Sequence, residues 1–208
     1  MVWPQQGNNK AMWAASMAPT IERGPELLKR YILTGAPGSG KTSILRDLER
    51  LGYPVIEEAA TDVVADEQAQ GHDPPRTGVD FIDKIVAMQV QRQQEPAPPE
   101  ALVQIFDRSP LCTLALAQYL GHPITDTLAR EVERMTQGQV YERSVLFVRP
   151  LGFVTPTAAR RISYEDSLRF EAVHESVYRS HGFDIVDIPV ADVAERAATV
   201  TAYITAWA

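Results

Sequence analysis

Residues 35–42 have the types and spacing of a phosphate-binding loop. They read Gly-Ala-Pro-Gly-Ser-Gly-Lys-Thr and fit the pattern G-x-x-x-x-G-K-[ST], in which glycines let successive N–H groups point inward and the lysine reaches the β- and γ-phosphates. The threonine hydroxyl of such a loop coordinates Mg²⁺. We therefore predict a nucleoside triphosphate site here. The predicted contacts are Gly35, Ala36, Pro37, Gly38, Ser39, Gly40, Lys41, Thr42 and Ser43, with Thr42 as a metal ligand.

A second polar cluster follows the apolar run 101–106. Asp107 and Arg108 come directly after this run and precede Ser109-Pro110. Open α/β sheets collect their ligands at the carboxyl ends of strands, and a carboxylate there can help to hold Mg²⁺. We interpret Asp107 as a metal ligand and catalytic residue, and Arg108 as a substrate contact. The alternative is that Asp107 only caps the following helix.

Two glutamates follow a short β-prone segment at 55–56. Glu57 and Glu58 would reach the same edge of a parallel sheet, where a carboxylate can remove the proton from an acceptor hydroxyl. We favour Glu58 as catalytic and substrate-binding residue. The alternative is a solvated glutamate that stabilises a helix N-terminus.

A pair of arginines, Arg160 and Arg161, lies in a predicted loop before a helix that opens at Ser163. Guanidinium groups that close over a γ-phosphate neutralise charge during phosphoryl transfer, so we interpret this pair as a catalytic lid; the alternative is a solvated pair. The four histidines have no metal-ligand spacing and receive no role, and the single Cys112 is interpreted as a buried thiol.

Strand and helix patterns alternate along the chain. Strands are predicted near 31–34, 55–56, 101–106, 145–148 and 183–188, and helices near 41–51, 59–70, 81–94, 111–120, 125–137, 163–181 and 190–207. Such alternation predicts an α/β fold of three layers, with a parallel five-stranded sheet covered by helices on both faces.

Composition limits the class of protein. A chain of 208 residues with 45% hydrophobic residues fits one domain, which we place at 28–208 behind a flexible leader at 1–27. The net charge of -7 argues against a general nucleic-acid binder. No window reaches the roughly 20 apolar residues of a membrane span. We expect a cytoplasmic protein, and the sequence does not indicate its oligomeric state.

Several segments together resemble the compact AAA-domain ATPase/kinase family related to the ribosylnicotinamide kinase domain of NadR. They are Tyr31 to Gly35 with the P-loop, Gly52 to Ala59, Phe106-Asp107-Arg108, and Gly182 to Val186 followed by Pro189 and Arg196. The resemblance implies a strand order of 2-3-1-4-5, ATP rather than GTP together with Mg²⁺, a lid at Arg160 and Arg161, and adenine near 193–196. Thr61 departs from the family, which often has an arginine there.

The sequence as a whole favours a P-loop kinase that moves the γ-phosphoryl group of Mg-ATP to a hydroxyl of a small, nucleoside-like acceptor. Its catalytic residues would be Lys41, Asp107, Glu58, Arg160 and Arg161. The alternatives are a nucleotide-dependent regulatory or binding protein with slow ATP or GTP hydrolysis, and a plain ATPase, because the fold does not fix the activity.

Overall fold

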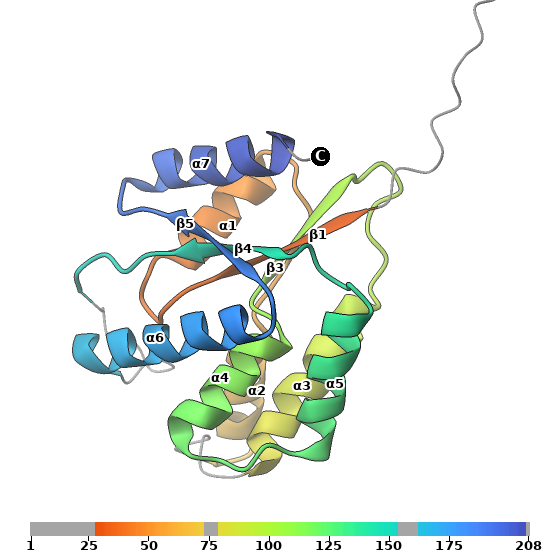
Figure 1. The fold of residues 1–208 in the computed structure, drawn as a ribbon, viewed down its shortest axis with the longest axis vertical. Coiled ribbons are helices and arrows are strands. Elements are labelled where there is room, and N and C mark those ends of the chain that lie inside the picture. Colours follow the sequence, from red (N-terminus) through yellow and green to blue (C-terminus); the bar gives the residue numbers. More distant parts are fainter. Residues whose placement is uncertain (1–27, 73–78, 154–161, 207–208) are drawn as a thin grey trace, which may run out of the picture.

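The computed structural model describes residues 28–72, 79–153 and 162–206. Five strands form one sheet in the order β2-β3-β1-β4-β5, and all neighbours pair in parallel. The strands are β1 Lys29–Thr34, β2 Val55–Ile56, β3 Val103–Asp107, β4 Ser144–Val148 and β5 Asp184–Ile188. The helices are α1 Lys41–Arg50, α2 Ala59–Ala69, α3 Val79–Gln93, α4 Pro110–Leu120, α5 Asp126–Gln137, α6 Tyr164–Ser180 and α7 Val193–Ala206. The predicted α/β fold and strand order are confirmed (Figure 1).

The sheet separates two hydrophobic cores. Successive side chains of a strand point to opposite faces, so Ile32 packs among helices α2 to α6 whereas Tyr31 and Leu33 pack against α1 and α7. Figure 1 shows α1 and α7 together on one side of the sheet and α6 with the other helices on the opposite side. This arrangement is the predicted three-layer architecture.

Strand β3 lies between β2 and β1 and is buried along its whole length. Its sequence is Val-Gln-Ile-Phe-Asp, and it places Val103 and Ile105 in one core and Phe106 in the other, as expected for a strand that is covered on both faces. The strand begins at Val103 rather than at 101, and Leu102 just before it is 47% exposed. Asp107 is the last residue of this buried strand.

Short polar side chains set the helix starts. Ser109 accepts the N–H of Leu111 at the start of α4, Thr125 accepts that of Leu128 in α5, and Ser163 accepts that of Asp166 in α6. Such caps satisfy N–H groups that have no partner within the helix.

Helix α7 begins at Val193, three residues later than the sequence pattern predicts. The side chain of Asp192 accepts the N–H of Glu195 at 2.8 Å, which starts the helix there, and Val190 remains 59% exposed before it.

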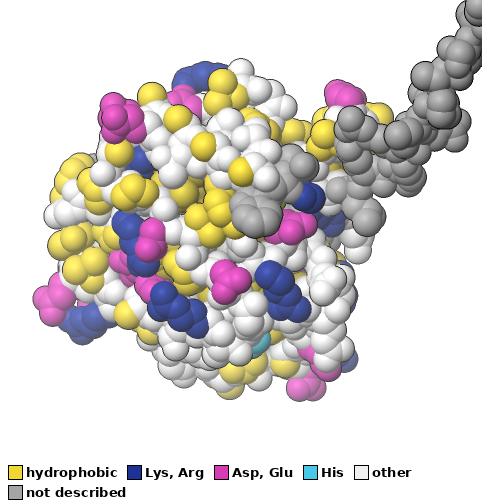
Figure 2. All heavy atoms as spheres, turned by 45° about the horizontal axis from the view of Figure 1, so that its top comes forward, with side chains coloured by type: hydrophobic (Ala, Val, Ile, Leu, Met, Phe, Trp, Pro, Cys, Tyr) yellow, Lys and Arg dark blue, Asp and Glu magenta, His cyan; other side chains and the backbone are white. Residues whose placement is uncertain are grey.

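On the face drawn in Figure 2, positively and negatively charged side chains are intermixed, with apolar side chains between them.

Within the part of the chain that the structure describes, no helix has the length and apolarity needed to cross a membrane.

Truncation of a buried side chain in β3 tests the core. We expect Ile105→Ala to lower the free energy of unfolding by about 2–5 kcal/mol, since Ile105 is fully buried and its removal leaves a cavity. The half-exposed Leu102 is the control, and Leu102→Ala should cost less than about 1 kcal/mol. Urea denaturation at constant m-value measures both changes. Equal losses would contradict the assignment of β3 to the core.

Candidate functional site

The loop between β1 and α1 has a backbone that only glycine can follow at two positions. Gly35 has φ +139°, and a Cβ atom on it would lie 2.3 Å from the carbonyl oxygen of Val148 on the neighbouring strand. Gly40 has φ +90° and ends the loop at the start of α1. None of the described side chains caps this helix start. The helix N-terminus is therefore open toward an anion, as in phosphate-binding loops.

Lys41 bends back over this loop. Its Nζ donates to the carbonyl oxygens of Gly35 and Ala36, both at 3.1 Å, and the residue is buried. Burial, aided by the charge of Arg108, lowers the pKa of Lys41 to about 8, although Asp107 and other acidic neighbours oppose the shift. An anionic phosphate beside this ammonium would offset the cost of its burial.

Arg196 of α7 binds the backbone of the P-loop. Its guanidinium donates to the carbonyl oxygen of Ser39 at 2.7 Å and to that of Arg149, after β4, also at 2.7 Å. The residue is only 2% exposed. Arg196 therefore connects α7 to the P-loop. The two residues of this contact, Arg196 and Ser39, are 157 positions apart in sequence. The proximity of 193–196 to adenine remains a prediction.

Asp107 is the last residue of β3 and lies beside Leu33 of β1 in the parallel register. It is 8% exposed, and its Oδ1 is buried without a hydrogen-bond partner among the described residues. Burial, reinforced by the nearby charge of Glu58, raises the pKa of Asp107 to about 6. Ser109 rather than Asp107 caps α4. The carboxylate is thus free of the capping role that its sequence context allowed.

The residues at this edge fit a magnesium ion. Mg²⁺ prefers oxygen ligands, keeps several waters, and in nucleotide sites uses one or two protein ligands together with phosphate oxygens. Thr42, in the first turn of α1, and Asp107 line the same cavity. The buried Oδ1 of Asp107 has no described hydrogen-bond partner, so a cation could occupy its free acceptor position.

Glu58 and Arg108 form an ion pair across the site. The Nε of Arg108 lies 2.5 Å from Oε1 of Glu58, although without hydrogen-bond geometry, and the two side chains are 10% and 28% exposed. Burial alone raises the pKa of Glu58, but the charges of Arg108 and Lys41 outweigh it, and its pKa lies below the ordinary value. Thr61 donates to Oε2 at 3.1 Å. Glu58 is therefore an ionised carboxylate at neutral pH.

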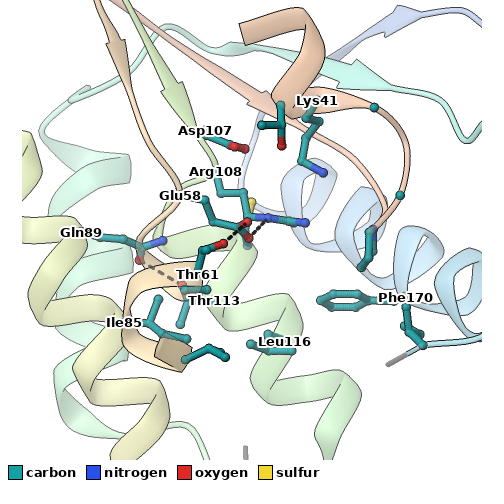
Figure 3. A pocket seen from close by; sticks show the side chains of 18 of the residues that line it. Lys41, Glu58, Thr61, Ile85, Gln89, Asp107, Arg108, Thr113, Leu116 and Phe170 are labelled. Atoms are coloured by element: carbon teal, nitrogen blue, oxygen red, sulfur yellow. Dashed lines mark hydrogen bonds and ion pairs between the residues drawn. The ribbon is translucent and has the colours of Figure 1, made fainter. Parts of the chain in front are cut away.

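One cavity of about 310 Å³ joins these groups. It begins at the P-loop around Lys41 and passes Asp107, Glu58 and Arg108 (Figure 3). Its far end is lined by Gln89 of α3 and Thr113 of α4, and by apolar side chains. The apolar residues of the cavity lining as a whole include Val64, Phe81, Ile85, Leu116, Ile162 and Phe170.

The predicted site residues divide into three groups. The P-loop, Glu58, Asp107 and Arg108 come together around the cavity. Glu57 is exposed, as expected for the solvated member of its pair. Arg160 and Arg161 lie outside the described residues, so their role as a lid remains a prediction.

The sequence singled out no individual residue at the far end of the cavity. Gln89, Thr113 and Phe170 carry no motif, and their helical spacing is equally typical of core packing. It also assigned no role to His174, which is fully buried and contacts Arg108. The spacing of Phe170 and His174 by one helical turn was the sole available signal, and it indicates only a shared face.

Solved structures with similar folds are enzymes and nucleotide-binding proteins. The deoxyadenosine kinase of M. mycoides, solved with dCMP and a flexible dCDP, is 14% identical with a TM-score of 0.60, over 86% of this chain and 100% of that one. NadR with NAD and AMP-PNP is 17% identical with a TM-score of 0.61, over 85% of this chain and 48% of that one. NadR in complex with NR is 18% identical with a TM-score of 0.62, over 85% of this chain and 49% of that one. At these identities the likeness is one of fold.

The sequence itself matches one family model. No curated protein sequence matches the chain, but the model described as an AAA domain matches residues 30–196. That range includes the P-loop, Glu58, Asp107, Arg108 and Arg196, and it confirms the family predicted from these motifs. Because the match spans most of the sequence, the chain belongs to this AAA-domain family of P-loop proteins.

Proposed function

We propose that this protein is an ATP-dependent phosphotransferase that moves the γ-phosphoryl group of Mg-ATP to a hydroxyl of a small, nucleoside-like acceptor. The observation that carries the proposal is the cavity of about 310 Å³, which continues from the P-loop past Glu58 and Arg108 to a partly apolar end. The nucleotide phosphates would fill the P-loop end of this cavity, and its partly apolar end suits a small organic molecule better than a single water.

The phosphate end of the cavity would hold the nucleotide. The loop amides and Lys41 would bind the β- and γ-phosphates, and Thr42 and Asp107 would hold Mg²⁺. When bound, the ion would neutralise charge that develops on the phosphate oxygens. Arg160 and Arg161 are proposed to cover the γ-phosphate from the segment outside the described residues.

The transfer step requires a base beside the acceptor. The acceptor oxygen attacks the γ-phosphorus, the bond from that phosphorus to the β,γ-bridging oxygen breaks, and ADP leaves. Glu58 is the favoured acceptor of the hydroxyl proton, because the charges of Arg108 and Lys41 keep it ionised and its side chain is partly accessible. Asp107 is the second candidate, but we place it on the metal. Arg108 would contact the acceptor or the transferring phosphoryl group.

The far end of the cavity suggests the shape of the acceptor. Ile85, Leu116 and Phe170 provide apolar walls, and between them Thr113 Oγ1 donates to Gln89 Oε1 at 3.0 Å (Figure 3). Apolar walls with a few placed polar groups suit a flat ring that carries hydrogen-bonding atoms at its edge. The fold is also that of deoxyadenosine kinase, which supports a nucleoside-like acceptor.

Incubation with Mg-ATP and a panel of acceptors tests the activity. We expect phosphorylated product from at least one ring-bearing alcohol, such as a nucleoside, and none from glycerol, which cannot fill the apolar end of the cavity. Chromatography of products and ADP release measure the transfer. Hydrolysis that no acceptor accelerates would contradict the proposal and favour a nucleotide-dependent regulatory protein.

Substitution of the proposed base separates chemistry from binding. Glu58→Gln should lower kcat by roughly 10²- to 10⁴-fold, as expected when a general base is lost, with little change in the affinity for ATP. The exposed neighbour supplies the control, and Glu57→Gln should leave kcat unchanged. Equal effects of the two substitutions would exclude Glu58 as the base.

Removal of the buried carboxylate tests the magnesium site. Asp107→Asn should weaken ATP binding in Mg²⁺ by roughly 10- to 100-fold and leave binding in EDTA little changed, because a charged ligand of the ion is lost. Isothermal titration calorimetry in both media measures this, with Asp47→Asn on α1 as control. Since Oδ1 of Asp107 is buried and unpartnered among the described residues, the melting temperature should not fall. Equal losses in Mg²⁺ and EDTA would contradict a metal role.

A further inference from the structure

Arg108 has a backbone conformation that side chains rarely adopt. Its φ is +74°, in the left-handed region that costs a residue with a Cβ atom roughly 1–2 kcal/mol. Its N–H donates to the carbonyl oxygen of Leu33 at 3.0 Å, so the turn after β3 is fastened to β1. Surroundings that over-determine a strained residue are typical of functional sites. The strained backbone therefore marks Arg108 as a candidate functional position.

Two groups from different elements hold the Arg108 guanidinium. Glu58, just before α2, forms the ion pair with Nε described above. His174 of α6 contacts Nη1 through its Nε2 at 3.2 Å. The two contacts involve different nitrogens of the planar group, so together they fix its orientation as well as its position.

The surroundings of His174 decide which ring nitrogen can accept. Its Nδ1 lies 3.0 Å from the carbonyl oxygen of Phe170, and a carbonyl only accepts, so Nδ1 carries the hydrogen. Nε2 is then the acceptor for Arg108. Burial, together with the charge of Arg108, lowers the pKa of His174 to about 3, so the ring is neutral near neutral pH. Toward Arg108 the ring is therefore a hydrogen-bond acceptor, and toward Phe170 it is a donor.

His174 also packs against a residue that lines the cavity. The rings of His174 and Phe170 lie with centroids 4.1 Å apart, and Phe170 lines the far end of the cavity. Because both residues belong to α6, the orientation of Arg108 and the placement of this wall are set by one helix.

We propose that His174 is a positioning residue that holds the Arg108 guanidinium against Glu58 and directs its remaining N–H groups toward the bound acceptor and phosphoryl group. The inference rests on the proposed function for what Arg108 contacts, but the positioning itself is a property of the protein without ligand. No contact of His174 with substrate is needed.

Two substitutions separate the two hydrogen bonds of the ring. His174→Gln can place an oxygen near the position of Nε2 and keep the acceptor for Arg108, whereas His174→Asn can keep the donor to Phe170 and lose that acceptor. Val177→Ala on the same helix is the structural control, since Val177 is buried and apolar. His174→Met replaces His174→Asn if the latter does not fold.

The first measurement uses the protein without ligand. The ¹⁵N relaxation of the Arg108 Nε–H group, assigned by its loss in Arg108→Lys, should give an order parameter near about 0.85 in the wild type and in His174→Gln, and below about 0.6 in His174→Asn. Val177→Ala should resemble the wild type. An unchanged order parameter in His174→Asn, or an equal drop in all three variants, would overturn the inference.

The second measurement uses the acceptor that the panel identifies. His174→Asn should lower kcat/KM for that acceptor by roughly 10- to 100-fold with the KM for ATP unchanged, and His174→Gln should restore most of the loss. A loss that Gln does not restore would also overturn the inference. If the relaxation changes as expected but no acceptor is phosphorylated, the proposed function fails and the positioning role of His174 stands.

Discussion

The site depends on the parallel pairing of β2, β3 and β1. Parallel strands end at the same edge of a sheet, so the segments that follow three adjacent strands must meet there. The register places Asp107 beside Leu33, two residues before the P-loop begins, and places Phe106 beside Ile56, two residues before Glu58. Residues separated by about seventy positions in sequence therefore line one cavity. A slip of one residue in either pairing would turn these side chains to the wrong face.

The edge that this pairing creates carries two cations and two anions with little access to water. Lys41 and Arg108 lie near Glu58 and Asp107, but only one cation and one anion form a close ion pair. Arg108 pairs with Glu58, whereas Lys41 donates to loop carbonyls and Asp107 keeps an oxygen without a described partner. The lysine and the aspartate are thus the groups whose burial is least compensated in the protein alone. A phosphate and its metal ion would supply the missing partners.

The sequence predicted the phosphate half of the site because its chemistry is local. Gly35, Gly40 and Lys41 lie within one loop, and their spacing alone specifies the backbone curl. Asp107 and Glu58 could be proposed because each comes at the end of a predicted strand, and both line the cavity. Gln89, Thr113 and His174 could not be singled out, since each lies inside a helix without a motif, and their contacts depend on how α3, α4 and α6 pack.

This difference follows from how the fold is connected. The phosphate half is formed by strand ends and by the loop after β1, which the parallel register fixes to within a residue. The part of the cavity that we propose for the acceptor is lined by residues of α2, α3 and α4, which belong to the connections on either side of β3, and of α6 after β4. Side chains on these helices can change without altering the register of the sheet. The strained Arg108, which contacts both α6 and the β2–α2 turn, lies at the boundary between these two parts of the cavity.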